Sequence, residues 1–289
     1  EVLKIESPFG DPSRKMVPLD GDRSAYFHVV NRNKEVQVLN LKNADGILKL
    51  KELLNSADVF LSNFLPERLA KLNLSVDSLQ KEFPKLIIGN LTSYGSIGKD
   101  ASTPGYDATV QARTGIMHLT GEPGRSPVRT GISVLDMGAG MWLALGILAA
   151  LVKRNETNTG SLVETSLYET GVTWVSYHLS AYQIDGKPTD RTGASHPTFS
   201  PYGLFTASDG EICFGVGSDE IFAKLANTIG KPEIIHDPRF STNKERVTNR
   251  ALLNQELNAI IATKDAKTWV ALLSKSGVPV DLVVPPENL

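Results

Sequence analysis

The sequence predicts an α/β fold: a doubly wound domain with a largely parallel sheet, followed by a smaller α+β domain. Three observations lead to this prediction. Short apolar segments alternate with amphipathic helical segments over the first two-thirds of the chain, which is typical of βαβ units. The segment "KLIIGNLTSYG" at 85–95 is apolar without alternation, as a strand covered on both faces is. After residues 186–201, which are rich in Gly, Pro, Thr and Ser, the pattern changes to a hairpin and helices.

The helices of the first domain have recognisable start signals. Residues 43–57 open with Asn and Asp and carry leucines at helical spacing, Pro66 stands at the first position of a helix, and Ser75 caps the next. The segment 26–41 is expected to be extended. Strands are further expected at 1–5, 58–64, 85–95 and 161–167, and helices at 66–72, 75–83, 106–121, 137–154 and 168–184.

The second domain opens with a predicted hairpin at 202–217, with Asp209-Gly210 at its turn. Three helical patterns and a short strand-like end follow, at 219–229, 249–263, 266–277 and 278–289. We therefore predict a large domain at 1–185, a linker or substrate loop at 186–201, and a small domain at 202–289.

Composition excludes several classes of partner. The chain has 289 residues, of which 41% are hydrophobic and 21% charged, and its formal net charge is −2. A nucleic-acid or anionic-membrane partner requires a basic face, which this balance does not supply. The longest apolar run, 141–152, is too short to span a bilayer. We therefore expect neither nucleic acid nor membrane as a partner.

The single cysteine, Cys213, excludes an internal disulfide and a zinc site built on cysteines. It suits a reducing, intracellular compartment, cytoplasmic or mitochondrial. The chain opens without an initiator Met, and both of its ends read as strands inside a longer protein. We therefore expect a further N-terminal segment, with any targeting signal out of view.

Motifs for common cofactors are absent. No G-x-G-x-x-G follows a strand, and no G-x-x-x-x-G-K-[ST] occurs. The five histidines form no H-x-x-x-H unit, so no metal site is predicted. No G-x-S-x-G elbow offers a serine nucleophile, and Cys213 lies in a predicted strand. Carboxylates remain as candidates for covalent chemistry.

Asp136 is the only acid in "GISVLDMGAGMWLALGILAALVKR" at 131–154, where Gly138 and Gly140 indicate a turn before a helix. An Asp there either caps the helix or is an approachable carboxylate beside N–H groups that hold anions. These residues by themselves favour the cap. Asp107 in "PGYDATVQA" has the same two interpretations.

The loop at 186–201 contains His196 beside Arg191 and Ser195. A solvated histidine and a binding histidine are both open interpretations.

Several segments together resemble the class III CoA-transferases of the CaiB/BaiF type, a family that also includes α-methylacyl-CoA racemases. They occur in the family's order across nearly the whole chain: "VLKIESPFGDPSR", "NRNKEVQVLNLK", "ADVFLSNFLPERLAKLNLS", "PKLIIGNLTSYG", "PGYDATVQARTGIMHLTGEPG", "VLDMGAGMWLALGILAALVKR" and "SPYGLFTASDGEICFGVG". The later segments "RFSTNKERVTNRALLNQEL" and "SGVPV" are similar to the succinate–hydroxymethylglutarate branch.

The resemblance implies a Rossmann-like large domain, a small domain and an interlocked homodimer. Asp136 falls where the family keeps its catalytic aspartate. The implied reaction passes an acyl group from an acyl-CoA to a small carboxylic acid through a covalent aspartyl intermediate. This chemistry requires an ionised carboxylate in a dry pocket. Helix N–H groups near Gly138 and Gly140 are expected to stabilise the carboxylate and an oxyanion.

The resemblance also implies coenzyme A, as acyl-CoA, at a set of loop and helix residues: Leu39, Lys42, Asn63, Phe64, Leu65, Lys71, Tyr106 and Asp107. A lysine near the phosphates acts as a point charge. Ser7 replaces a basic residue that some members place after the "KIE" strand, which is a departure from the family pattern.

Two other functions remain open. A racemase of this family uses a His–Asp pair, but Tyr106 stands in "GYD" where "GHD" is expected, and a phenol is a poor partner for proton exchange. A non-catalytic acyl-CoA binding protein would use Asp136 only as a cap. For a transferase, the closest branch implies dicarboxylic acids, such as succinyl-CoA with a glutarate-like acceptor. Arg191, Ser195 and His196 would then hold the distal carboxylate.

Overall fold

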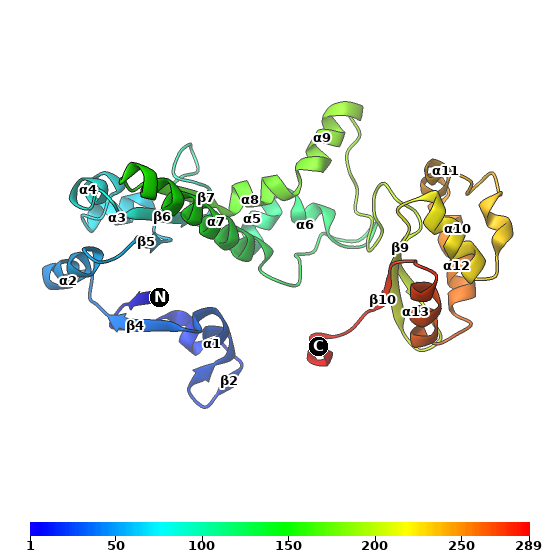
Figure 1. The fold of residues 1–289 in the computed structure, drawn as a ribbon, viewed down its shortest axis with the longest axis horizontal. Coiled ribbons are helices and arrows are strands. Elements are labelled where there is room, and N and C mark those ends of the chain that lie inside the picture. The colour runs from blue at the N-terminus through cyan, green and yellow to red at the C-terminus, as the bar shows by residue number, and fades with distance from the viewer. The chain divides into compact units, whose positions relative to one another are not determined.

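The computed structural model describes residues 1–289, and its contacts divide the chain into two compact units (Figure 1). Unit 1 comprises residues 1–115 and 131–179, and unit 2 comprises residues 116–130 and 180–289. The segment 116–130, which lies within the predicted large domain, has its contacts in unit 2. The predicted domain limits at 185 and 201 stay a prediction, and the two units are described separately.

Unit 1 contains two parallel sheets. β5 (Val59–Ser62), β6 (Ile87–Thr92) and β7 (Leu162–Ser166) form one sheet with β6 in the centre. β1 (Val2–Glu6) and β4 (Lys34–Val38) form the other. The continuous apolar pattern of β6 is explained by its position, because Ile87, Ile88 and Gly89 are all buried. The predicted mixed α/β architecture with parallel pairing is confirmed for this unit.

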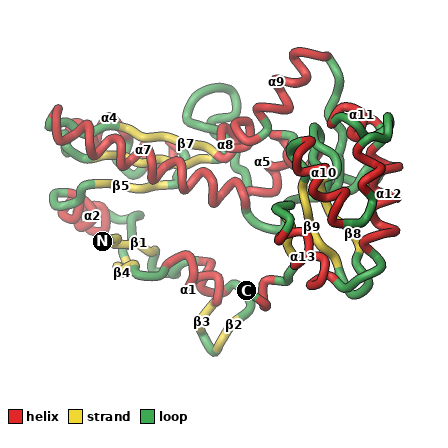
Figure 2. Tube along the Cα trace, turned by 45° about the vertical axis from the view of Figure 1, so that its right-hand side comes forward, coloured by secondary structure: helices red, strands yellow, loops and turns green.

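The helices of unit 1 begin at the predicted caps. Asn43 caps α2 (Ala44–Leu54), Pro66 is the first residue of α3 (Pro66–Lys71), and Ser75 caps α4 (Val76–Glu82). The other main helices here are α5 (Asp107–Thr114), α7 (Val134–Thr157) and α8 (Leu167–Trp174). Figure 2 shows α7 running along the three-stranded sheet, where it packs against β6 and β7. The long helix predicted at 168–184 is divided into α8 and α9 (Ser176–Asp185).

The expectation that 26–41 is extended is wrong for its first part. Residues Ala25–Asn31 form α1, which Ser24 caps by accepting a hydrogen bond from the backbone N–H of Phe27 at 3.2 Å. The Phe27 ring lies beneath two cations, with Arg14 Cζ 4.0 Å and Lys4 Nζ 4.6 Å from its centroid. These contacts come from β1 and from the 3₁₀ turn Pro12–Lys15, so tertiary packing overrides the β-branched composition of this segment.

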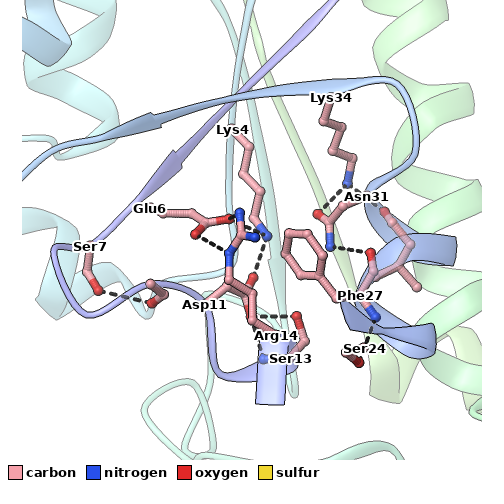
Figure 3. A network of polar contacts seen from close by, with 12 residues as sticks. Lys4, Glu6, Ser7, Asp11, Ser13, Arg14, Ser24, Phe27, Asn31 and Lys34 are labelled. Carbon is pink, nitrogen blue, oxygen red and sulfur yellow. Dashed lines mark hydrogen bonds and ion pairs between the residues drawn. The ribbon is translucent and has the colours of Figure 1, made fainter. Parts of the chain in front are cut away.

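A polar network fixes the segment that follows β1 (Figure 3). Glu6 is buried and accepts two hydrogen bonds from Arg14, at 2.8 and 2.9 Å. Lys4 pairs with Glu6 at 3.3 Å and with Asp11, whose Oδ1 also accepts hydrogen bonds from the backbone and hydroxyl of Ser13. Burial by itself would raise the pKa of Asp11, but the hydrogen bonds from Lys4 and Ser13 outweigh it and hold this pKa at about 2.

We expect Asp11 to contribute to acid stability. A carboxyl whose pKa falls from 3.8 to about 2 on folding stabilises the protein above pH 4, and this contribution disappears as the pH falls through about 2. Its size is at most about 2 kcal/mol. Urea unfolding at pH steps from 5 to about 2 measures it: Asp11→Asn should lose less stability over this range than the wild type. Parallel curves for the two proteins would contradict the assignment.

Unit 2 has a separate core around an antiparallel sheet. β8 (Tyr202–Thr206) and β9 (Glu211–Gly215) form the predicted hairpin, and β10 (Val280–Leu282) pairs with β9. Its main helices are α10 (Asp219–Thr228), α11 (Asn243–Thr248), α12 (Arg250–Ile261) and α13 (Ala266–Lys275). Trp269 is buried among them, and its indole N–H donates to the Ile261 carbonyl at 2.6 Å.

α7 is longer than the apolar run that predicted it. With 24 residues, it is the one helix that by length and composition is able to cross a membrane, a test that core helices of soluble proteins also pass. Gly138, Ala139, Leu143 and Ala150 face the unit and are buried. The opposite side carries large exposed apolar residues, which we call the α7 stripe: Met137, Met141, Leu145, Leu148 and Val152.

Candidate active site

The predicted ligand residues of unit 1 lie where parallel strands end. Leu39 follows β4, Asn63 to Leu65 follow β5, and the loop that leads to Tyr106 and Asp107 follows β6. Ligands of open α/β sheets bind at this carboxyl edge. The structure therefore places these residues on the connections that such a site requires.

Asp136 is the third residue of α7, not its cap. The helix begins at Val134 and its N-cap residue is Ser133, so the capping interpretation of Asp136 is wrong. Its side chain is exposed and accepts no hydrogen bond. Burial of part of the carboxyl, and then the negative charge of Asp107, raise the pKa of Asp136. An unpartnered carboxylate with a raised pKa is a stronger base and nucleophile than an ordinary aspartate.

Asp107 is the first residue of α5, and its carboxylate bonds to a different helix. Its residue exposure is only 6%. Oδ2 accepts hydrogen bonds from the backbone N–H groups of Leu135, at 2.8 Å, and of Asp136, at 3.2 Å. Oδ1 accepts from the side-chain amide of Gln111. Gln111 was not among the predicted site residues, although its spacing of four residues from Asp107 places both on one helix face.

The turn expected at Gly138 and Gly140 does not exist, because both residues lie inside α7. In a helix their N–H groups bond to carbonyls one turn earlier, so they are not directed at a ligand. Gly138 serves packing instead. A Cβ atom there would lie 2.4 Å from the Trp174 ring of α8. A Cβ atom at Gly140 would meet nothing within 4 Å.

These two glycines give a matched pair of predictions. Gly138→Ala forces Trp174 to move and should lower the free energy of unfolding by about 1–3 kcal/mol. Gly140→Ala improves helix propensity without a clash and should raise it by up to about 1 kcal/mol. Chemical denaturation of both variants provides the measurement. Equal effects would show that α8 does not pack on α7 as described.

The remaining residues predicted to contact coenzyme A differ in how far their side chains are exposed to solvent. The Leu39 side chain belongs to the core of unit 1, so only its backbone is able to face a ligand. Lys42 and Lys71 are exposed and form no ion pair. Tyr106 is 84% exposed. All four belong to unit 1.

The loop that follows β5 adds one cation that the sequence analysis did not single out. Asn63 is exposed, and Leu65 is the N-cap residue of α3. Arg68 stacks on Phe64, with its Cζ 3.9 Å from the ring centroid. Phe64 lies before the N-cap residue of α3, so helical spacing did not predict this contact.

Arg191, Ser195 and His196 belong to unit 2. The Arg191 guanidinium donates to the carbonyls of His118, at 2.7 Å, and Arg125, at 2.9 Å, so it ties two segments of unit 2 together. The Ser195 carbonyl accepts from the hydroxyl of Thr192 at 2.6 Å. These bonds give the loop a defined shape.

His196 packs against the rings of Phe199 and Tyr202, with centroids 5.0 and 5.2 Å away. Burial, and then the positive charge of Arg250, lower the pKa of His196. Arg250 therefore is the cation that acts on this histidine, which the sequence analysis missed because Arg250 lies on a distant helix.

Comparison with known proteins assigns the family. The family model described as CoA-transferase family III matches residues 1–289. The chain belongs to CoA-transferase family III. It is similar to the acetyl-CoA:oxalate CoA-transferase of Acetobacter aceti, with 36% identity over 96% of this chain and 72% of that protein. It is also similar to the succinyl-CoA:glutarate CoA-transferase of Mus musculus, with 34% identity over 96% of this chain and 64% of that protein.

A solved structure of the same family agrees in fold. The crystal structure of a CaiB/BaiF family protein from Brucella suis matches with a TM-score of 0.87 at 33% identity, covering 100% of this chain and 78% of that one. This chain therefore belongs to a family of enzymes and has the same fold as a crystal structure from that family. The chain spans 64% to 72% of the length of the two transferases above.

Within this family III chain, the dry pocket expected around Asp136 is not complete, because the side chain is exposed. A covalent acyl intermediate needs protection from water.

Proposed function

We propose that the protein is an acyl-CoA:carboxylate CoA-transferase in which Asp136 carries the acyl group covalently. The observation that carries this proposal is the state of the Asp136 carboxylate. It lies in the first turn of α7 without a hydrogen-bond partner, and its pKa is raised by burial and by Asp107. A structural cap would be bonded to backbone N–H groups, whereas a nucleophile must be free to reach a substrate.

The proposed reaction proceeds through two anhydrides. The Asp136 carboxylate attacks the thioester carbonyl of the donor acyl-CoA, forming a mixed anhydride and releasing CoA thiolate. The thiolate attacks the aspartyl carbonyl, so the donor acid leaves with one former Asp136 oxygen and an aspartyl–CoA thioester remains. An acceptor carboxylate attacks this thioester and again gives an anhydride and thiolate. The thiolate then attacks the acceptor acyl carbonyl, which releases the new acyl-CoA and restores Asp136 with one acceptor oxygen.

We further propose that coenzyme A lies along the carboxyl ends of β4 and β5. The backbone at Leu39 and the loop 63–65 would contact it, and Lys42 and Lys71 would meet its phosphates as point charges. The exposure of both lysines and their lack of ion pairs support this role. Tyr106, which is highly exposed beside the start of α5, would line the reacting end. No step of the reaction requires a metal ion.

The proposed acids are dicarboxylic, with succinyl-CoA as donor and a glutarate-like acceptor. The names of the similar transferases from Acetobacter aceti and Mus musculus, which mention oxalate and glutarate, support this class. In unit 2, Ser195 and His196 are candidates to meet the distal carboxylate, while Arg191 orders their loop through its carbonyl bonds. Rates with succinyl-, oxalyl-, formyl- and butyrobetainyl-CoA against several acids test the substrate class. Exclusive use of monocarboxylates would contradict it.

We also propose an interlocked homodimer, in which a second copy covers the α7 stripe. The five exposed apolar side chains of the stripe lie along one side of a single helix, and contiguous exposed apolar surface of this kind is typical of protein–protein interfaces. A two-fold axis beside the stripe would pair it with itself. The same packing would bring protein close to the start of α7, where Asp136 needs protection from water.

The racemase alternative is not favoured, since the position of its histidine is occupied by Tyr106. Deuterium incorporation at Cα of a 2-methylacyl-CoA in heavy water checks this, and we expect no enzyme-dependent exchange.

The covalent step has a direct test. Wild-type protein incubated with donor acyl-CoA and then treated with hydroxylamine should acquire a hydroxamate at Asp136, visible by peptide mass spectrometry. A protein that binds acyl-CoA with no adduct at any residue would support the non-catalytic binding alternative instead.

A further inference from the structure

The start of α7 is completed by a residue from another helix. Ser133, its N-cap residue, makes no side-chain cap. Instead the buried carboxylate of Asp107 accepts the N–H groups of Leu135 and Asp136, at 2.8 and 3.2 Å. Gln111 donates to the other oxygen of the same carboxylate. Asp107 therefore caps a helix that begins 27 residues later in the sequence than Asp107 itself.

Every backbone N–H group in the first turn of α7 donates a hydrogen bond. Val134 donates to the Ile132 carbonyl at 2.9 Å, and Met137 donates to the Ser133 carbonyl at 3.1 Å. With Leu135 and Asp136 bonded to Asp107, no N–H group of the first turn remains for the Asp136 side chain. A carboxylate near a helix start usually gains stability from these groups, and here that stabilisation is taken by a second carboxylate.

We propose that Asp107 is a positioning residue for the Asp136 nucleophile: it fixes the backbone of Asp136 and withholds the helix N–H groups from the Asp136 carboxylate. This inference rests on the proposed function of Asp136. Its consequence is a nucleophile held in place by its main chain alone, with a carboxylate that accepts no hydrogen bond from the helix N–H groups. Asp107 itself is buried and does not need to touch the substrate.

Asp107 is also the one charge that acts on Asp136. The elements packed on α7 are α5, α8, β6 and β7, and they carry few titratable groups. Besides Asp107, the titratable groups on these elements are Arg113, Glu164, Glu169 and Tyr168. Arg113 pairs with Asp100, Glu164 accepts a hydrogen bond from Ser96, and Glu169 accepts one from Ser166. Only Asp107 joins burial in raising the pKa of Asp136. Removal of its charge should therefore lower that pKa.

The test compares Asp107→Asn with the wild type. The amide keeps an oxygen for the N–H groups of α7 but loses the charge. We expect the pKa of Asp136 to fall, the acid limb of kcat against pH to move to lower pH, and kcat at neutral pH to fall about 10-fold with KM within about 2-fold. Carbon-13 NMR of aspartate labelled at Cγ, with Asp136→Asn to assign the signal, measures the pKa without any turnover.

Two further variants keep the result clear. Asp107→Ser is also neutral and retains a hydroxyl acceptor, so it serves if the amide variant does not fold, with the same direction expected. Asp265→Asn is the matched control, because Asp265 caps α13 in unit 2 through the N–H of Thr268. It should leave the pKa of Asp136 and the pH profile unchanged.

The outcomes separate this inference from the proposed function. An unchanged or raised pKa of Asp136 in both neutral variants would overturn the role of Asp107, even if the wild type forms its aspartyl adduct. A lowered pKa without any adduct would show that Asp107 acts on the Asp136 carboxylate, whereas the proposed function, and with it the nucleophilic role of Asp136, would fail. If the Asp107 variants are less stable than the wild type but have the same dependence of kcat on pH, Asp107 is only a structural cap of α7.

Discussion

Asp136→Asn is expected to reduce CoA transfer at least about 1,000-fold while leaving acyl-CoA binding within about 3-fold. The amide has nearly the same shape as the carboxylate but is a poor nucleophile, so both anhydride steps are blocked. Removal of a covalent nucleophile typically has an effect of this size or larger, because the later steps depend on the first. Transfer assays and isothermal titration with a non-reactive acyl-CoA analogue measure the two quantities.

The matched control for Asp136→Asn is Asp77→Asn. Asp77 is an exposed acid in the first turn of α4, so the same substitution is made at a comparable position. Its activity should equal that of the wild type. If Asp136→Asn instead kept more than about a tenth of the wild-type rate, the nucleophile would have to be another residue.

Charges placed in the α7 stripe are expected to abolish both the dimer and the activity. Met141 and Leu148 are exposed and lie two turns apart on the same side of α7. If a second copy covers them, replacing both by Asp buries two unpaired carboxylates from each copy in the interface, which costs several kcal/mol. The double variant should elute as a monomer in light scattering, and its transfer rate should fall at least about 100-fold because Asp136 loses its cover.

Leu48→Asp is the control for this second prediction, since Leu48 is an exposed leucine on α2. It should leave the oligomeric state unchanged. A wild-type protein that is monomeric and fully active, or a double variant that remains dimeric, would show that the stripe is not the interface.

The sequence predicted those features that depend on local chemistry. Asn43, Pro66 and Ser75 mark helix starts through capping and backbone geometry, which involve only neighbouring residues. The hairpin of β8 and β9 was predicted for the same reason. The parallel strand β6 was visible because burial on both faces leaves a continuous apolar pattern.

The features that the sequence did not reveal depend on partners distant along the chain. Gly138 resembled a turn residue, but it lies inside α7, where the Trp174 ring of α8 leaves no room for a Cβ atom. Asp136 resembled a cap, but Asp107 takes the N–H groups that a cap would bind. The bonds of the Arg191 guanidinium to two backbone carbonyls were likewise not apparent from the sequence. Each case required a contact that no local pattern encodes.

The transfer of an oxygen atom from the acceptor acid to the enzyme is a direct test of the covalent aspartyl intermediate. In the proposed mechanism each turnover leaves one acceptor oxygen on the carboxylate of the nucleophile. With an acceptor acid labelled with oxygen-18 at its carboxylates, we expect label in the peptide that contains Asp136, and none in that peptide when the acceptor is omitted. Formation of the new acyl-CoA over many turnovers, with an unlabelled Asp136 peptide, would contradict the covalent role of this residue.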